Sequence, residues 1–154
     1  MNTENMDALD KKKFIFGCLF LLANKLQVIG DKFLSRDGIT IRQWFLTVMI
    51  LQFHDKPPTL GEVAELMGSS HQNVKQLALK LQQKDFLVIE KDEQDGRVIR
   101  LRLTDKSHAY WQTREEDGDR FIKELFRDLT EEEINSISMG FNKLLEKLEK
   151  WPQQ

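Results

Sequence analysis

Residues 70–84 bring hydroxyl, amide and lysine side chains together in a segment that contains no Asp or Glu. Its candidate contact residues are Ser70, Gln72, Asn73, Lys75, Gln76 and Lys80. Side-chain amides can hydrogen-bond base edges in the major groove of DNA, adenine in particular, and lysines pair with phosphates. Because the whole chain has a net charge of −2, a locally basic segment of this kind indicates contact with nucleic acid.

A second basic set lies on a predicted β-hairpin. Two stretches of alternating polarity, 86–91 and 97–103, flank a turn-like segment made of Asp92, Glu93, Gln94, Asp95 and Gly96. On the second strand the alternation places apolar residues on one face and Arg100 and Arg102 on the other. We therefore expect basic side chains to line the outer face of the hairpin, with Arg100 as a candidate contact to nucleic acid.

Helical patterns predict the elements that hold these two sets in place. Three helix starts carry a reciprocal capping pair, namely Thr40 with Gln43, Thr59 with Glu62, and Thr130 with Glu133. Apolar residues return every three or four positions in predicted helices at about 12–34, 40–53, 59–67, 70–84, 105–127 and 131–150. A mainly α protein with a small β-hairpin follows from this order.

The middle of this order is a short capped helix, a bend at Gly68, a second helix and the hairpin. In the second helix an apolar stripe faces inward and consists of Val74, Leu77, Ala78 and Leu81. The amides and lysines must then face outward. This arrangement is the sequence form of a winged helix-turn-helix.

Length and composition limit the remaining possibilities. With 154 residues, of which 40% are hydrophobic, the chain can form one domain with a substantial core. The single cysteine, Cys18, excludes an internal disulfide and favours a reducing cytoplasm. We expect no membrane association, since acidic residues precede Lys11–Lys13 and the uninterrupted apolar run 14–23 falls short of the ~20 residues of a spanning helix.

Nothing in the sequence predicts catalysis. His54, His71 and His108 are isolated and lack partners at metal-ligand spacing, and neither a phosphate-binding loop nor a nucleophile elbow is present. We therefore expect no enzyme activity, no metal and no cofactor.

Three segments together resemble the MarR family of winged-helix regulators. They are Thr40-Ile41-Arg42-Gln43-Trp44, the run 60–87, and Asp92-Glu93-Gln94-Asp95-Gly96-Arg97 with Leu103-Thr104. The last of them is similar to the D-x-x-D-x-R pattern of the family wing. Two departures are Asp85 and Ser107, which stand where such sequences commonly carry glycine. Asp tolerates left-handed backbone better than most residues, so the first departure should be harmless to the fold.

The resemblance implies a homodimeric, ligand-responsive transcription factor, most simply a repressor, that binds palindromic DNA. It places residues 70–80 in the major groove and Arg97 in the adjacent minor groove. Asp92 and Asp95 would tighten the wing turn, together with Gly96, and orient Arg97. We expect a single domain over 1–154, with dimerisation helices at 12–34 and 105–150 and a DNA-binding lobe at 40–104.

Two alternative functions and one further site remain open at this stage. The winged helix could bind a protein instead of DNA, or Cys18 could make the protein a redox-sensing repressor, although its apolar neighbours favour a buried, protonated thiol. A small apolar or aromatic effector could bind among the helices, where the candidate residues are Phe16, Phe20, Trp44 and Trp111.

Overall fold

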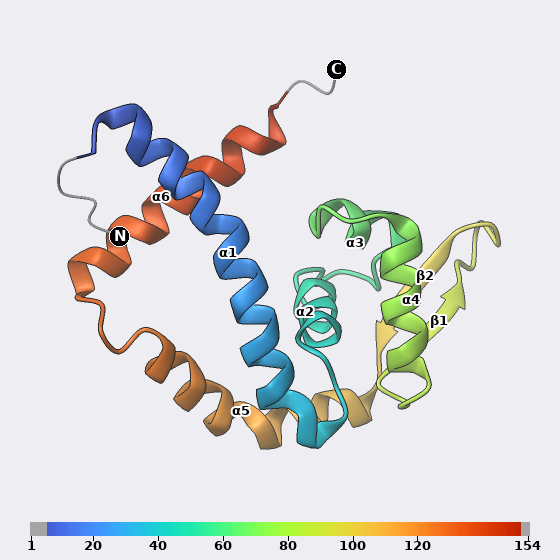
Figure 1. Ribbon diagram of the computed structural model, residues 1–154. Helices are drawn as coiled ribbons and strands as arrows, with labels where there is room; N and C mark the ends of the chain where they lie inside the picture. Colours follow the sequence, from blue (N-terminus) through green and yellow to red (C-terminus); the bar gives the residue numbers. More distant parts are fainter. Residues whose placement is uncertain (1–5, 152–154) are drawn as a thin grey trace. The chain divides into compact units, whose positions relative to one another are not determined.

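The computed structural model describes residues 6–151 and confirms a mainly helical fold with one small hairpin (Figure 1). In chain order the elements are α1 (Ala8–Leu34), the 3-10 helix η1 (Ser35–Asp37), α2 (Ile41–Ile50), α3 (Leu60–Leu66), α4 (His71–Gln82), β1 (Leu87–Lys91), β2 (Ile99–Leu103), α5 (Asp105–Leu125) and α6 (Glu131–Glu149). Two compact units result, the first ending at Ala109 and the second beginning at Tyr110.

The helix starts follow the capping residues closely. All three reciprocal capping pairs form, at the beginnings of α2, α3 and α6. α1 begins earlier than its apolar pattern predicts, because Asp7 accepts hydrogen bonds from the backbone N–H groups of Leu9 and Asp10 at 2.8 Å. α2 ends at Ile50, before its predicted end near Phe53. After Leu51 the backbone hydrogen bonds join residues three apart, as in a tighter turn, instead of four apart.

The core of the first unit lies between α2, α3, α4 and the hairpin. Its largest fully buried side chains include Leu46, Leu81, Leu87 and Leu101, one from each of α2, α4, β1 and β2. On α4 the predicted inward stripe is confirmed, with Val74, Ala78 and Leu81 fully buried and Leu77 partly so. Figure 1 shows the hairpin extending alongside α4.

α1 is fastened to α2 by a close helix contact and a hydrogen bond. A carboxylate oxygen of Asp31 accepts from the backbone N–H of Ile41 at 2.7 Å. At Gly30 the helix has no room for a side chain, because a Cβ there would lie 2.7 Å from Cγ1 of Ile41. The C-terminal end of α1 therefore packs in the same unit as the winged helix.

The hairpin pairs Leu87 with Leu103 and Lys91 with Ile99 in an antiparallel register. The loop before α3 runs along the other side of β2. There the backbone N–H of Leu101 donates to the carbonyl of Pro58 at 2.9 Å, and Thr59 forms an isolated bridge with Arg100. These bonds satisfy the outer backbone groups of β2 and connect the hairpin to the start of α3.

Large apolar side chains remain exposed along α1 and α6. In α1 only Gly30 and Leu34 are buried, and α6 has no buried residue within the described chain.

By length and composition alone, Ala8–Asp37 could cross a membrane, which differs from the expectation based on the uninterrupted apolar run. The difference arises because the apolar character continues past that run through Leu26, Val28 and Ile29, interrupted by few charged residues.

Candidate nucleic-acid interface

The turn between α3 and α4 aims the start of α4 outward. Gly68 adopts a left-handed backbone with φ of 58°, a conformation that glycine reaches without strain. Ser70 then caps α4 by accepting a hydrogen bond from the N–H of Asn73 at 3.2 Å. The free N–H groups of the first turn and the positive end of the helix dipole favour a phosphate at this position.

The outer face of α4 brings together all six residues predicted there. Each of them is exposed, while the opposite stripe is packed in the core. The amides come from Gln72, Asn73 and Gln76, and the ammonium groups from Lys75 and Lys80. An exposed helix face with amides near its N-terminus and lysines beside them has the chemistry needed to read base edges and bind phosphates.

The wing, defined here as residues 87–103, presents Arg97 at its tip. Its side chain is 91% exposed, and its guanidinium donates from Nε and Nη2 to the two carboxylate oxygens of Asp95, both at 3.1 Å. The bond to Arg97 lowers the pKa of Asp95, and Asp95 raises the pKa of Arg97. Asp95 therefore orients Arg97, as predicted, while leaving one side of the guanidinium open to solvent.

Arg100 does not occupy the position predicted for it on the outer face of the hairpin. Its Nε donates to Asp92 and its Nη1 donates to the carbonyl of Pro57 at 2.7 Å. Only 15% of the side chain is exposed. Strand alternation did not reveal this arrangement, because the loop that carries Pro57 folds back along β2 and covers Arg100.

Asp92 also acts differently from the expectation. It tightens the turn by accepting from the N–H groups of Gln94 and Asp95, but its guanidinium partner is Arg100 rather than Arg97. Hydrogen bonds from the Asp95 backbone, the Arg100 side chain and the Gln94 backbone lower the pKa of Asp92 to about 2. The carboxylate therefore remains ionised throughout the physiological range.

The two departures from the family pattern fit the fold. Asp85 has a φ of 58°, the left-handed conformation that a glycine would adopt at this position. Ser107 is fully buried, and its N–H donates to Oγ1 of Thr104 at 3.1 Å. Thr104 in turn donates to the carbonyl of Asp85 at 2.6 Å, so the two unusual positions belong to one hydrogen-bonded junction.

The residues predicted for an effector are spread over three helices. Phe16 and Phe20 pack edge to face on α1, with ring centroids 5.2 Å apart, and both rings are largely exposed. Trp44 lies half-buried on α2, and Trp111 belongs to the second unit.

Cys18 is half-exposed in a single copy of the chain, which differs from the expected buried thiol.

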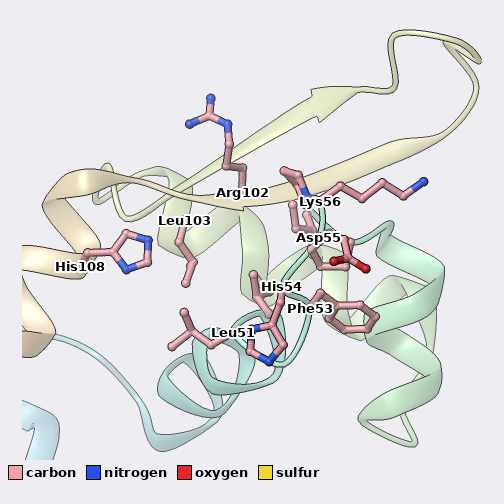
Figure 2. Close-up of a pocket in the computed structure, with 12 residues that line it drawn as sticks. Leu51, Phe53, His54, Asp55, Lys56, Arg102, Leu103 and His108 are labelled. Carbon is pink, nitrogen blue, oxygen red and sulfur yellow. The ribbon is translucent and has the colours of Figure 1, made fainter.

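An open pocket of about 350 Å³ lies elsewhere, between the end of α2, the loop before α3, and β2 (Figure 2). Leu51 and Leu103 supply apolar walls, and His54 and His108 stand near them. Figure 2 shows that the charged ends of Lys56 and Arg102 point away from these leucines. Arg102 is paired with Glu90 at 3.2 Å. Neither Lys56 nor Arg102 therefore directs its charge at the apolar wall of the pocket.

Comparisons with known proteins agree with this geometry. Solved structures with the same fold include a MarR protein from Peptoclostridium difficile, which is 19% identical, with a TM-score of 0.78 and coverage of 97% of this chain and 94% of that one. S. aureus MepR, solved as a DNA complex, is 20% identical with a TM-score of 0.74, covering 86% and 97%. A mutant E. coli MarR, solved with operator DNA, is 18% identical with a TM-score of 0.75, covering 91% and 99%. No curated protein matches the sequence.

The helix order, the turn at Gly68 and the hairpin define the class of the protein as a winged helix-turn-helix. Residues 37–98, which include α2, α3, α4, β1 and the wing turn, match the model of the MarR family. Over this segment the chain is similar to members of the MarR family.

Proposed function

We propose that this protein is a sequence-specific DNA-binding transcriptional regulator that acts as a homodimer on a palindromic operator, most simply as a repressor. The observation that carries the proposal is the exposed face of α4, which combines amides and lysines with no acidic side chain. Gln72, Asn73 and Gln76 would contact base edges in the major groove. Lys75 and Lys80 would bind phosphates, and Arg97 would enter the adjacent minor groove, where a narrow negative channel suits a guanidinium.

The relatives solved with DNA support this function. S. aureus MepR in its DNA complex and the mutant E. coli MarR with operator DNA both share the fold over most of this chain. The sequence identities are low, so the proposal depends on the chemistry of this chain's own α4 and wing. A winged helix that docks a protein would need an apolar or acidic outer face on α4, and this one is mainly amide and lysine.

The homodimer would cover the exposed apolar surfaces of α1 and α6. Leu145, Leu148 and Trp151 are each at least 60% exposed on one copy of the chain, as are Phe16 and Phe20 on α1. A soluble protein rarely leaves so much apolar surface in contact with water, so a second copy would bury it. This packing also accounts for an apolar α1 without a membrane and is consistent with a cytoplasmic protein.

We propose that DNA binding also responds to a small ligand. A small apolar or aromatic effector would suit exposed rings such as Phe16 and Phe20. Trp44 and Trp111 are the other candidate residues. Under this proposal, effector binding shifts the spacing of the two α4 helices and thereby weakens operator binding.

The function is tested by selecting bound duplexes from a random DNA pool. We expect recovery of an inverted repeat with half-sites about one helical turn apart. The variant Lys75→Glu should recover no motif, whereas Lys12→Glu, the same charge change on α1, should recover the parent motif. If the parent enriches no sequence even at low salt, the protein-docking alternative replaces the proposal.

A further inference from the structure

The guanidinium of Arg100 joins the wing to the loop that precedes α3. Its Nη1 donates to the carbonyl of Pro57, and its Nε donates to Asp92. Both charged side chains are only 15% exposed, so water competes weakly for these bonds. The adjacent backbone bond from Leu101 to Pro58 reinforces the same junction.

Asp92 extends this connection to the wing tip. One of its carboxylate oxygens accepts from the N–H groups of Gln94 and Asp95, while the other accepts from Arg100. Asp95 in turn holds the guanidinium of Arg97. A continuous series of hydrogen bonds therefore runs from the exposed Arg97 to Pro57, which lies just before α3 and its capping residue.

We propose that Asp92 and Arg100 are positioning residues that fix the wing tip relative to α3 and α4 and so determine where Arg97 meets DNA. This proposal rests on the proposed DNA-binding function. Neither side chain is exposed enough to contact a phosphate itself. They act through Arg97. The link joins the wing to the loop before α3, and α3 packs directly on α4, so the link sets the position of the wing tip relative to both helices.

The physical reason lies in the weakness of an isolated hairpin. A two-stranded ribbon twists easily and has little stability of its own, so its tip moves over a wide range unless a side contact holds it. A planar guanidinium that bonds two partners in fixed directions restricts that motion better than a single ion pair. A wing held in place before binding loses less conformational freedom when it enters the groove.

Asp92→Asn separates positioning from simple electrostatics. The amide oxygen can still accept from Gln94 and Asp95, whereas the amide nitrogen can no longer accept from Arg100. Removing a negative charge beside DNA should by itself tighten binding. If positioning is lost, the variant should instead bind DNA more weakly than the parent, by roughly fivefold to tenfold. Glu93→Gln, the same charge change at an exposed residue of the same turn, should leave the affinity unchanged or slightly higher.

A second variant and a double-mutant cycle complete the test on a selected duplex. Arg100→Gln should weaken binding at least as much as Asp92→Asn, because it loses the same link and a positive charge as well. The salt dependence should stay nearly unchanged, because no phosphate contact is removed. In either background the further change Arg97→Ala should cost less than half of what it costs in the parent. If Arg97→Ala costs as much in these two backgrounds as in the parent, or if Asp92→Asn binds as tightly as Glu93→Gln, the positioning role is overturned.

A measurement without DNA keeps this inference separate from the proposed function. Hydrogen exchange at the Leu101 amide and ¹⁵N relaxation at Gly96 should show faster exchange and greater mobility in Asp92→Asn than in Glu93→Gln, at unchanged overall helicity. Identical behaviour of the two variants would refute the link even if the parent binds DNA. A parent that fails to bind DNA while the wing loosens as expected would refute only the proposed function.

Discussion

Asp92 holds an ionised carboxylate at a junction of the wing turn, since backbone N–H groups of Asp95 and Gln94 and the guanidinium of Arg100 lower its pKa to about 2. An unperturbed aspartate titrates near ~3.9. A carboxylate whose pKa is depressed by folding stabilises the native state above its unfolded pKa, and this stabilisation is lost as the pH falls toward the folded value.

We therefore expect the difference in Tm between the parent and Asp92→Asn to be constant from neutral pH down to about 5. It should shrink between about pH 4 and pH 2 as Asp92 itself becomes protonated. Thermal unfolding followed by circular dichroism across this range measures the difference. A difference that persists unchanged at pH 2 would mean that the carboxylate of Asp92 does not interact as the structure shows.

Cys18 should be a structural residue. It lies on the apolar surface of α1 and is half-exposed in one copy of the chain, where a second copy would cover it. A thiol covered by a second copy would be shielded from peroxide. Cys18→Ala should therefore retain parental DNA affinity with and without peroxide, as measured by fluorescence anisotropy. Peroxide-dependent release of DNA by the parent but not by the variant would establish the redox-sensing alternative.

The environment of a single residue can be predicted from the sequence where neighbouring residues determine it, but not where tertiary structure determines it. Asp95 and Arg97 are close in sequence, and their pairing follows from the turn. Arg100 was expected on the outer face because strand alternation places it there. Its actual partner, Pro57, lies in a loop distant in sequence, and no local pattern predicts how that loop packs.

Among the elements, the α1–α2 contact is the most sensitive to side-chain size. A Cβ at Gly30 would lie within 3 Å of three side-chain atoms of Ile41, including Ile41 Cβ, which cannot move away without shifting α2. A Cβ at Gly17, on the same helix, meets nothing within 4 Å.

Gly30→Ala should accordingly destabilise the protein, because overpacking costs about 1–3 kcal/mol, more than the roughly 1 kcal/mol that alanine gains over glycine in a helix. Gly17→Ala, which has the gain without the clash, should be neutral or stabilising by up to about 1 kcal/mol. Urea unfolding at one protein concentration compares the two. If Gly30→Ala proves as stable as Gly17→Ala, α1 and α2 do not pack as closely as described.

The elements themselves were predictable because caps and periodicity are properties of short segments. Thr59 with Glu62 and Thr130 with Glu133 placed the starts of α3 and α6 correctly. The start of α1 was predicted too late, because Asp7 caps the helix before the apolar pattern begins. Helix ends were less accurate where tight turns, as after Ile50, continue the chain without regular helix.

At the scale of the whole molecule, the exposed apolar surfaces of α1 and α6 lead to a prediction about assembly. Light scattering at micromolar concentration should give a mass of twice 18.1 kDa. Leu148→Lys on α6 should produce a monomer, whereas Leu66→Lys, at an exposed leucine of α3, should remain dimeric. A stable, monodisperse monomer of the parent protein would contradict the proposed homodimer.

The most direct test of sequence-specific DNA binding titrates the parent, Gln76→Ala and Arg97→Ala against selected and scrambled duplexes at several salt concentrations. Gln76→Ala should lose about 1–3 kcal/mol of discrimination between the duplexes with a nearly unchanged salt slope, since an amide reads a base edge. Arg97→Ala should weaken binding to both duplexes and lower the slope of log affinity by ~1 per wing. If Gln76→Ala weakens binding to both duplexes equally, α4 does not read the sequence. If Arg97→Ala leaves the salt slope unchanged, the wing does not anchor the protein on DNA.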